Sequence, residues 1–505
     1  MSRKPEGAPL RVLVDLKPAL DGYAGIPQES RLLFRELVRL ENLEVEGLIQ
    51  HGGRRLRPGL KPDASRLSVD KRVDLLSKVV VSLYENPYSN IWEQALQGLD
   101  KLFARQALRL RSHLGLTLPM TQFDSTLFED FVWRTFFSKT LSPADREVLR
   151  GARYRILEHP RVMMHKAGLA GLRYSDTPSY PRIRTKGIDA FITQTPFPGR
   201  VQQGTQLIVR YHDAVPILMP HTVSDKAFHQ ASHFHALKDN VNNGAWFSCI
   251  SNATREDLLK VFPQAEKRSF VIHNIVSDEY YVAEPTPERV FDIIRNRVSS
   301  SDELPVTIPR EFRSPLPGAA LQYLLMVSTL EPRKNHQLLL QAWEQLRYTQ
   351  YPELKLVLVG NPGWDQGPIL NSMKPWSKRG DLFWLNNVPA AELRVLYQHA
   401  AVTVCPGFAE GFDYAGVEAM KCECPILSSD IPVHREIYGA ASEYFSAYSV
   451  SDAVNALQKL LSSEWAEARK QRVGYGTQIS RNYSSAEIQP KWIDFLSRKN
   501  PKRSK

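Results

Sequence analysis

Two carboxylates and two cations stand close to predicted helix starts in the C-terminal half of the chain. Glu410 lies in a loop that contains a proline and two glycines, and Glu418 lies in the helix that follows. Arg333 and Lys334 come just before another predicted helix. Cations at a helix amino end oppose the helix dipole, so they are well placed only if they bind an anion that the helix also favours. The pattern indicates a diphosphate site.

The helix that carries Glu418 offers free backbone N–H groups to the same anion. The first N–H groups of a helix have no partner within it and favour anions. Here they belong to Tyr414, Ala415, Gly416 and Val417. No Walker-type lysine motif and no acidic pair for a metal-held phosphate accompanies them. We therefore expect the cations to replace a metal, and we predict no metal and no separate cofactor.

His212 and Asp213 directly follow a predicted buried strand at 206–211. Ligands of open α/β sheets bind beyond the carboxyl ends of the strands, which makes this a functional position. The alternative is a histidine that only closes the strand end. His229 and His233 have the spacing of a zinc-binding helix, but glutamine replaces the required glutamate and no further ligand is near, so a metal site is disfavoured.

Strand and helix patterns alternate in both halves, which predicts two doubly wound, parallel α/β domains. Helical patterns interrupt the alternation in the first half, whereas several prolines and the run SSSDELP mark a linker. The predicted organisation is a first domain at 1–283 with a helical insertion at about 51–185, a linker at 284–318, a second domain at 319–463, and C-terminal helices at 464–505 that are candidates for crossing back to the first domain and end in a basic tail.

The net charge of +11 suggests an anionic partner: a nucleotide diphosphate, an acidic membrane surface or nucleic acid. Nucleic acid is disfavoured because no basic patch has interleaved aromatic residues. The four cysteines fit a reducing cytoplasm. The chain shows neither a secretory signal nor an apolar run long enough to span a bilayer. We therefore expect a cytoplasmic protein whose membrane contact, if any, is peripheral at the inner face of the membrane.

The segment 101–116 is the candidate for that membrane contact. It is amphipathic and basic, with Lys101, Arg105, Arg109 and Arg111. Such a helix can lie on an anionic membrane or grip a partner. The alternative is an ordinary surface helix that packs its leucine and phenylalanine side chains inward.

A series of ordered motifs resembles the retaining glycosyltransferases of family four, which have the GT-B architecture. The motifs are STLEPRKN, VLVGNPGW, LNNVPAAELRVLYQHA, EGFDYAGVEAM and SSDIPVHREIYG, within about 322–445. The resemblance is weaker over 10–50 and 188–274, and it does not account for 51–185. It implies two Rossmann-like domains facing a cleft, with a nucleotide-diphosphate sugar on the second domain and a glycan or lipid-linked acceptor on the first.

The resemblance also implies roles for residues around the nucleotide. Glu418 would hydrogen-bond the ribose hydroxyls, and Val388 would lie beside the base. Gly25 would let the backbone approach the phosphates. Family members usually act without a metal.

At the reacting sugar, the resemblance gives Glu410 a contact near the reacting face and His212 a contact from the first domain. Lys334 would stabilise the leaving diphosphate. Retention is thought to proceed by front-face attack, with the leaving phosphate taking the acceptor proton.

Two positions depart from the family pattern. Thr329 stands where arginine is common, and Arg333 is the candidate replacement for that charge. Asp413 replaces the second glycine of EGFG; it could hydrogen-bond the sugar or only cap the following helix. These variants resemble bacterial polysaccharide and O-antigen mannosyltransferases, which points to GDP-mannose as donor.

The sequence therefore predicts a retaining hexosyltransferase of surface polysaccharide or lipopolysaccharide biosynthesis. A first alternative is a GT-B sugar-nucleotide epimerase, which would need extra acid–base groups facing the sugar. A second is a non-catalytic anion-binding protein, which would give no reason for Glu410, Glu418 and Lys334 to occur together.

Overall fold

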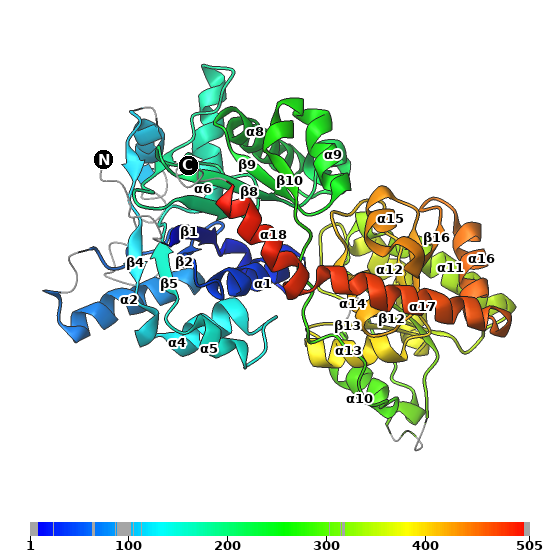
Figure 1. Cartoon of the computed structure of the whole chain (residues 1–505). Coiled ribbons are helices and arrows are strands. Elements are labelled where there is room, and N and C mark those ends of the chain that lie inside the picture. The colour runs from blue at the N-terminus through cyan, green and yellow to red at the C-terminus, as the bar shows by residue number, and fades with distance from the viewer. Residues whose placement is uncertain are drawn as a thin grey trace.

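Aliphatic runs form the strands of two mainly parallel sheets, one in each of two lobes (Figure 1). The computed structural model describes residues 9–498, apart from residues 24, 63–65, 86, 88–102, 105, 113, 302–303, 314 and 316–318. Helices cover both faces of each sheet. The predicted α/β class with doubly wound parallel sheets is confirmed.

The sheet of the first lobe has the order β10-β9-β8-β7-β1-β2-β5-β4, and only the β4–β5 pair is antiparallel. Its strands are β1 (Leu10–Asp15), β2 (Leu43–Ile49), β4 (Thr121–Phe123), β5 (Arg153–Ile156), β7 (Ala190–Thr193), β8 (Gln206–Tyr211), β9 (Trp246–Cys249) and β10 (Ser269–Val271). The strand order reverses between β1 and β7, so a ligand crevice is expected beyond the carboxyl ends of the neighbouring strands.

Helices of the first lobe pack on both faces of this sheet. They are α1 (Ile26–Val38), α2 (Val69–Tyr84), α4 (Glu129–Val132), α5 (Asp145–Leu149), α6 (Arg161–Leu169), α7 (Val215–Leu218), α8 (Lys226–Asn242) and α9 (Asn252–Val261), with a π-helix at Trp133–Phe137. Apolar side chains of α1, α2 and the π-helix fill one core, and those of α6, α8 and α9 fill the other. Two short strands, β3 (Thr117–Leu118) and β6 (Arg182–Ile183), pair separately.

The sheet of the second lobe has the order β13-β12-β11-β14-β15-β16 and is wholly parallel. Its strands are β11 (Tyr323–Val327), β12 (Lys355–Val359), β13 (Leu382–Leu385), β14 (Val402–Cys405), β15 (Ile426–Ser429) and β16 (Ser442–Phe445). Its helices are α10 (Glu288–Arg297), α11 (His336–Thr349), α12 (Gly367–Arg379), α13 (Ala390–His399), α14 (Tyr414–Lys421), α15 (Pro432–Tyr438) and α16 (Val450–Leu461). Because β11 and β14 are adjacent, the loops that follow them meet at one edge.

The C-terminal helices connect the two lobes (Figure 1). Helix α17 (Ala466–Ser480) packs on α14 of the second lobe, where Gly476 lies against Met420. Helix α18 (Ser485–Ser497) buries Trp492 and Phe495 in the core of the first lobe. The lobes are therefore joined by the chain twice.

Two features of the predicted organisation need correction. The interval 51–185 is not purely helical, because β5 pairs in parallel with β2 and extends the main sheet. This strand reads Arg-Tyr-Arg-Ile, so charged residues hide it from a search for apolar runs. The interval 284–318 is not simply a linker, since α10 buries Val290 and Ile294 in the core of the second lobe. Its neighbouring prolines obscured the helical spacing.

In the predicted amphipathic segment 101–116, residues 106–112 are helical, and residues 101–102, 105 and 113 lie outside the described residues. The basic residues 499–505 at the end of the tail also lie outside them. Within the described chain, no helix combines the length and the apolar character needed to cross a membrane.

Candidate active site

Glu410 lies between two cations where the loops after β11 and β14 meet. Its Oε1 accepts a hydrogen bond from Lys334 Nζ at 2.5 Å, and its Oε2 accepts one from Arg333 Nη1 at 3.1 Å. Arg333 also donates from Nε to Glu331 at 3.1 Å. The structure thus brings together three of the predicted site residues as a largely buried charge cluster.

The charges in this cluster stabilise one another. Burial alone would lower the pKa of Arg333, but the negative charges of Glu410 and Glu331 raise it instead. Glu331 was not among the predicted residues; it also accepts a hydrogen bond from Thr329 at 2.8 Å. Thr329, which stands where the family commonly has arginine, therefore hydrogen-bonds Glu331, the carboxylate that orients Arg333.

The loop that carries Glu410 lies directly against the first lobe. A Cβ atom on Gly411 would fall 1.9 Å from the carbonyl oxygen of His212, so only glycine fits this approach. Ser251 Oγ, at the start of α9, donates a hydrogen bond to the Gly411 carbonyl at 2.8 Å. The predicted residues His212 and Glu410 thus belong to facing segments of the two lobes.

His212 is buried and held in place by Gln194, with 3.0 Å between His212 Nε2 and Gln194 Oε1. Burial and, secondarily, the charge of Arg210 keep the pKa of His212 well below its ordinary value. The imidazole is therefore neutral at pH 7 and can exchange hydrogen bonds with a polar ligand. Asp213, the next residue, adds negative charge near Arg333.

Asp413 precedes α14 with a φ of 60°, but its side chain makes no capping hydrogen bond. Its Oδ2 lies 3.2 Å from Nε2 of the buried His434. Burial alone would raise the pKa of Asp413, but His434 and the charge of Lys334 hold it well below its usual range. The capping alternative is therefore wrong. The carboxylate is ionised within the site, and its contact with a sugar stays a prediction.

Glu418 lies on α14 and is enclosed by hydrogen-bond donors from both lobes. Gln28 Nε2, in the first turn of α1, donates to its Oε1 at 2.9 Å, and the Tyr397 hydroxyl donates to its Oε2 at 3.0 Å. Burial raises the pKa of Glu418 to about 7. Glu418 can accept hydrogen bonds from vicinal hydroxyls, as its predicted ribose contact requires, once Gln28 yields its place.

This raised pKa predicts a pH-dependent stability. The folded carboxyl keeps its proton at pH values where the unfolded chain, with a value near 4.5, has already lost it. The stability that the protonated Glu418 contributes to the folded state is thus fully present below pH 4.5 and is lost as the pH rises through about 7. It changes the free energy of unfolding by about 3 kcal/mol. Glu418→Gln should remove this slope.

Urea unfolding at pH 5 and pH 8 would measure the effect as a difference between variant and wild type. Glu392→Gln, which removes a more exposed carboxylate paired with Arg297, serves as the control and should keep the wild-type slope. Equal slopes for Glu418→Gln and wild type would contradict the raised pKa.

A buried polar network beside Glu418 was missed by the sequence reasoning. Glu29, in the first turn of α1, accepts from Arg210 Nε at 2.8 Å and from the Tyr414 hydroxyl of the second lobe at 2.9 Å. Burial raises the pKa of Glu29 although Arg210 partly offsets it. The sequence did contain a sign of this network, because Arg210 is a cation within the mainly apolar strand β8.

The remaining predicted residues have the following places. Gly25 precedes α1 with a φ of 71°, and a Cβ there would meet nothing within 4 Å, so open space lies beside this backbone. Val388 is packed in the core of the second lobe and is 7% exposed. Tyr414, Ala415, Gly416 and Val417 form the buried first turn of α14. Their contacts with a nucleotide stay predictions.

Metal ligation finds no support among the described residues, which contain no group of three or more histidine, cysteine, aspartate or glutamate side chains arranged to hold an ion. His233 packs against Tyr211, with 5.9 Å between ring centroids. Burial lowers its pKa to about 4. His229 on the same helix is exposed, so the described histidines of α8 do not form a group of three or more that could hold an ion.

Residues 309–478 match the family described as glycosyl transferases group 1. The second lobe is therefore similar to group 1 glycosyltransferase domains. This domain is similar to O-antigen chain mannosyltransferase B of Escherichia coli, with 34% identity over 147 residues, which is 29% of this chain and 38% of that protein. The serotype-specific mannosyltransferase WbdA of Escherichia coli is 32% identical over 144 residues, 28% of this chain and 18% of WbdA. The chain thus spans well under half the length of these relatives.

The whole chain resembles solved GT-B glycosyltransferases in fold. Sucrose-phosphate synthase from Thermosynechococcus elongatus aligns with a TM-score of 0.58 at 14% identity, covering 97% of this chain and 98% of that chain. HepE from Anabaena, solved with UDP-glucose, aligns with a TM-score of 0.53 at 12% identity, covering 97% and 100%. The chain therefore has the two-lobed GT-B fold, as the motifs predicted.

Proposed function

We propose that this chain is a retaining hexosyltransferase that moves mannose from GDP-mannose to a glycan or lipid-linked acceptor in surface polysaccharide biosynthesis. The observation that carries the proposal is the position of Glu410 between Arg333 and Lys334, on a loop that faces His212 across the lobes. The similarity to O-antigen mannosyltransferases supports mannose as the sugar.

In this proposal the donor diphosphate takes over Arg333 and Lys334 from Glu410. Both cations then neutralise the charge that develops on the leaving phosphate, without a metal. The C1–O bond to the phosphate breaks while the acceptor oxygen bonds to C1 on the same face, and the leaving phosphate accepts the acceptor proton. Glu410, no longer fully paired, lies beside the sugar as positive charge develops at C1.

The nucleoside of the donor would lie on the α14 side of the cluster formed by Glu410, Arg333 and Lys334. The free N–H groups at the start of α14 favour the diphosphate, and Glu418 accepts the ribose hydroxyls in place of Gln28. His212 and Asp413 contact the hexose from opposite lobes. Hydrolysis is disfavoured by the absence, among these residues, of a second unpaired carboxylate placed to activate water.

Thermal unfolding with a panel of GDP-, UDP-, ADP- and dTDP-sugars tests the proposal. A ligand at about 100 times its dissociation constant stabilises the fold by roughly 2.7 kcal/mol, so GDP-mannose should raise the unfolding temperature most. The shift should vanish in Lys334→Ala. A panel without any shift would contradict the donor site, and turnover of the donor sugar into its epimer without acceptor would favour the epimerase alternative.

We further propose a peripheral membrane contact through the helix around residues 106–112. Leu110 and Leu114 are 60% and 63% exposed, and Arg109 and Arg111 flank Leu110. Exposed leucines next to arginines suit an anionic lipid surface. Phe103 and Leu116 add exposed apolar surface nearby.

Leu110→Asp should therefore weaken co-sedimentation with phosphatidylglycerol vesicles several-fold, because it places a negative charge on the contacting surface. Phosphatidylcholine vesicles should bind less of the wild-type chain. Tyr348→Asp, at a 78% exposed position of the second lobe, is the matched control and should bind normally. Equal binding by both variants would refute the contact.

A further inference from the structure

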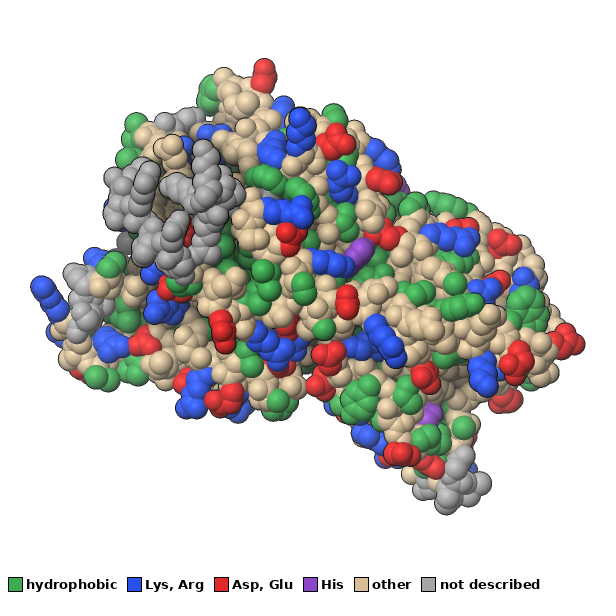
Figure 2. Space-filling model, viewed as in Figure 1, with side chains coloured by type: hydrophobic (Ala, Val, Ile, Leu, Met, Phe, Trp, Pro, Cys, Tyr) green, Lys and Arg blue, Asp and Glu red, His purple; other side chains and the backbone are tan. Residues whose placement is uncertain are grey.

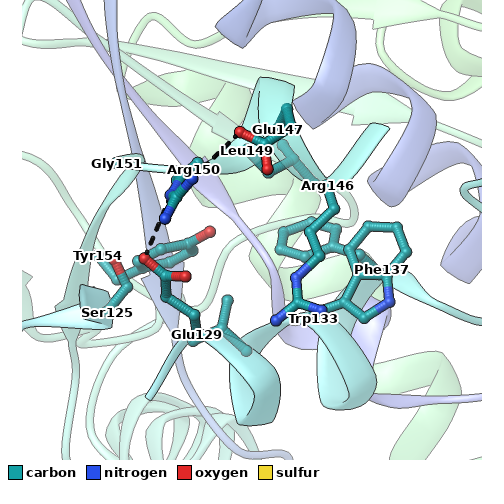
Figure 3. A pocket seen from close by; sticks show the side chains of 11 residues that line it. Ser125, Glu129, Trp133, Phe137, Arg146, Glu147, Leu149, Arg150, Gly151 and Tyr154 are labelled. Carbon is teal, nitrogen blue, oxygen red and sulfur yellow. Dashed lines mark hydrogen bonds and ion pairs between the residues drawn. The ribbon is translucent and has the colours of Figure 1, made fainter. Parts of the chain in front are cut away.

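Two visible features of the described chain do not mark a further site. On the face shown in Figure 2, lysine and arginine side chains are interspersed with aspartate and glutamate. The cavity between the π-helix and β5 has a volume of about 40 Å³, enough for a few water molecules. Arg150 at its edge pairs with Glu129 at 3.7 Å and with Glu147 at 3.4 Å (Figure 3). A buried histidine of α15, beside the candidate active site, carries more information.

His434 lies in the first turn of α15 and is wholly buried. Its Nδ1 lies 2.9 Å from the Ser429 carbonyl oxygen and 3.1 Å from Ser429 Oγ. The Ser429 hydroxyl donates its own hydrogen to the Gly407 carbonyl at 2.6 Å, so both Ser429 oxygens can only accept from the ring. Nδ1 of His434 therefore carries a hydrogen.

The other ring nitrogen of His434 faces Asp413. Nε2 lies 3.2 Å from Asp413 Oδ2, an ion-pair distance, and has no aligned hydrogen-bond partner among the described residues. The ring stacks on Tyr438, with 5.1 Å between centroids and 22° between planes. The Tyr438 hydroxyl donates to the Asp413 carbonyl at 3.1 Å. Helix α15 thus holds both the carboxylate and the backbone of Asp413.

His434 connects the two ends of the loop that carries Glu410. Gly407, at the start of this loop, is bonded to Ser429 and lies so near Glu410 that a Cβ atom on it would fall 2.9 Å from Glu410 Oε1. Asp413 ends the loop. One buried ring therefore fixes the loop on both sides of Glu410.

Asp413 itself has a strained backbone. Its φ of 60° lies in the left-handed region, which glycine adopts at less cost than aspartate. Strain of this kind is concentrated at functional sites. The side chain keeps 9% of its surface exposed, and the charge of Lys334 acts on it. A strained carboxylate with its own buried partner is thus placed beside the cations of the candidate active site.

We propose that His434 is a positioning residue for the hexose of the donor and acts through Asp413. It holds one oxygen of the Asp413 carboxylate, so that the carboxylate keeps a fixed orientation toward the sugar hydroxyls. This proposal rests on the proposed function, in which the hexose lies against Asp413. A carboxylate fixed in advance loses less conformational freedom on binding, so the sugar is bound more tightly. The nucleotide lies apart from this pair and does not depend on it.

Two replacements of His434 separate its two contacts, because an asparagine amide can take the place of Nδ1 and a glutamine amide that of Nε2. His434→Asn keeps a donor for Ser429 and loses the contact with Asp413, whereas His434→Gln keeps a donor for Asp413. In calorimetric titrations His434→Asn should raise the dissociation constant of GDP-mannose about tenfold and leave that of GDP unchanged. His434→Gln should stay within about twofold of wild type for both ligands.

Asp413→Gly tests whether His434 acts through Asp413. The variant should fold, because a φ of 60° suits glycine, and adding His434→Asn to it should weaken GDP-mannose no further. His399→Asn is the matched control: His399 ends α13 and accepts from Thr286 N at 3.2 Å, and its replacement should change neither affinity. Additive losses, equal losses of GDP and GDP-mannose affinity in His434→Asn, or no loss there at all would overturn the proposal.

The contact between His434 and Asp413 can be measured without any ligand. Nitrogen NMR of isotopically labelled histidine side chains should show a protonated Nδ1 in His434, and Asp413→Gly should shift the Nε2 resonance while Nδ1 stays protonated. An unchanged Nε2 resonance would overturn the proposal. If wild type binds neither GDP nor GDP-mannose, the proposed function fails, while this spectrum still tests the pair.

Discussion

Glu410→Gln is expected to abolish sugar transfer and, at the same time, to tighten the binding of the nucleotide diphosphate product. In the unliganded protein both Lys334 and Arg333 donate to Glu410, so Glu410 would compete with the proposed donor diphosphate for the two cations. Neutralising this carboxylate frees the cations, so the bare nucleotide should bind about tenfold more tightly. Transfer should fall by about 10³-fold in kcat, the cost of removing one electrostatic group at the reacting centre.

The free energy of unfolding provides a second measure of the same change. Removing one partner of a buried ion pair leaves an uncompensated charge and costs about 3 kcal/mol. The unliganded Glu410→Gln variant should therefore unfold at lower temperature than wild type, and nucleotide should restore more stability to it than to wild type. Calorimetric titration with GDP and thermal unfolding with and without GDP measure both effects.

Glu443→Gln is a matched control for this experiment. Glu443 also lies between two cations of the same lobe, Arg472 and Lys459, but on β16, apart from the candidate site. Its replacement should cost stability without changing transfer or nucleotide affinity. Weaker nucleotide binding in Glu410→Gln, or transfer at the wild-type rate, would contradict the role of Glu410.

The second large effect is expected from Lys334→Ala and Arg333→Ala. Each removes a cation that we propose neutralises the leaving diphosphate, so kcat/KM should fall by about 10²- to 10³-fold per residue. Lys334→Ala should also lower donor affinity, because its ammonium is the closest cation to Glu410. Steady-state kinetics over a range of donor concentrations separate the two contributions.

Arg333 allows a further test, because it is proposed to supply the charge that the family commonly places at position 329. Adding Thr329→Arg to Arg333→Ala should therefore recover part of the lost activity. Lys355→Ala is the control: Lys355 pairs with Asp381 at 2.6 Å, but at the amino end of β12, the opposite edge of the sheet. It should affect stability alone. Full activity of Lys334→Ala would refute the diphosphate site.

The strands that position the site could be predicted from the sequence because they are uninterrupted apolar runs. β8 has the expected bounds at 206–211, and β11 and β14 are apolar runs of the same kind. The loops after these three strands hold His212 and the Glu410 cluster. Elements with mixed composition were missed, as in α12, which contains Pro375. Strand β5 has alternating charges and shows no such run.

The polar contacts between the lobes could not be predicted in the same way. Gln28 and Glu418 are 390 residues apart in the chain and meet only when the two lobes are placed together. The same holds for Glu29 and Tyr414. Asp413 shows the limit of local reasoning, because a residue type that commonly caps helices pairs here with His434 instead.

Proton NMR of the reaction with GDP-mannose and a mannosyl acceptor tests the proposed retaining transfer directly. We expect a new glycosidic linkage with the anomeric configuration of the donor, formed only when acceptor is present. No such linkage is expected with Glu410→Gln. A product of inverted configuration, or consumption of the donor at the same rate without acceptor, would contradict the proposed transfer.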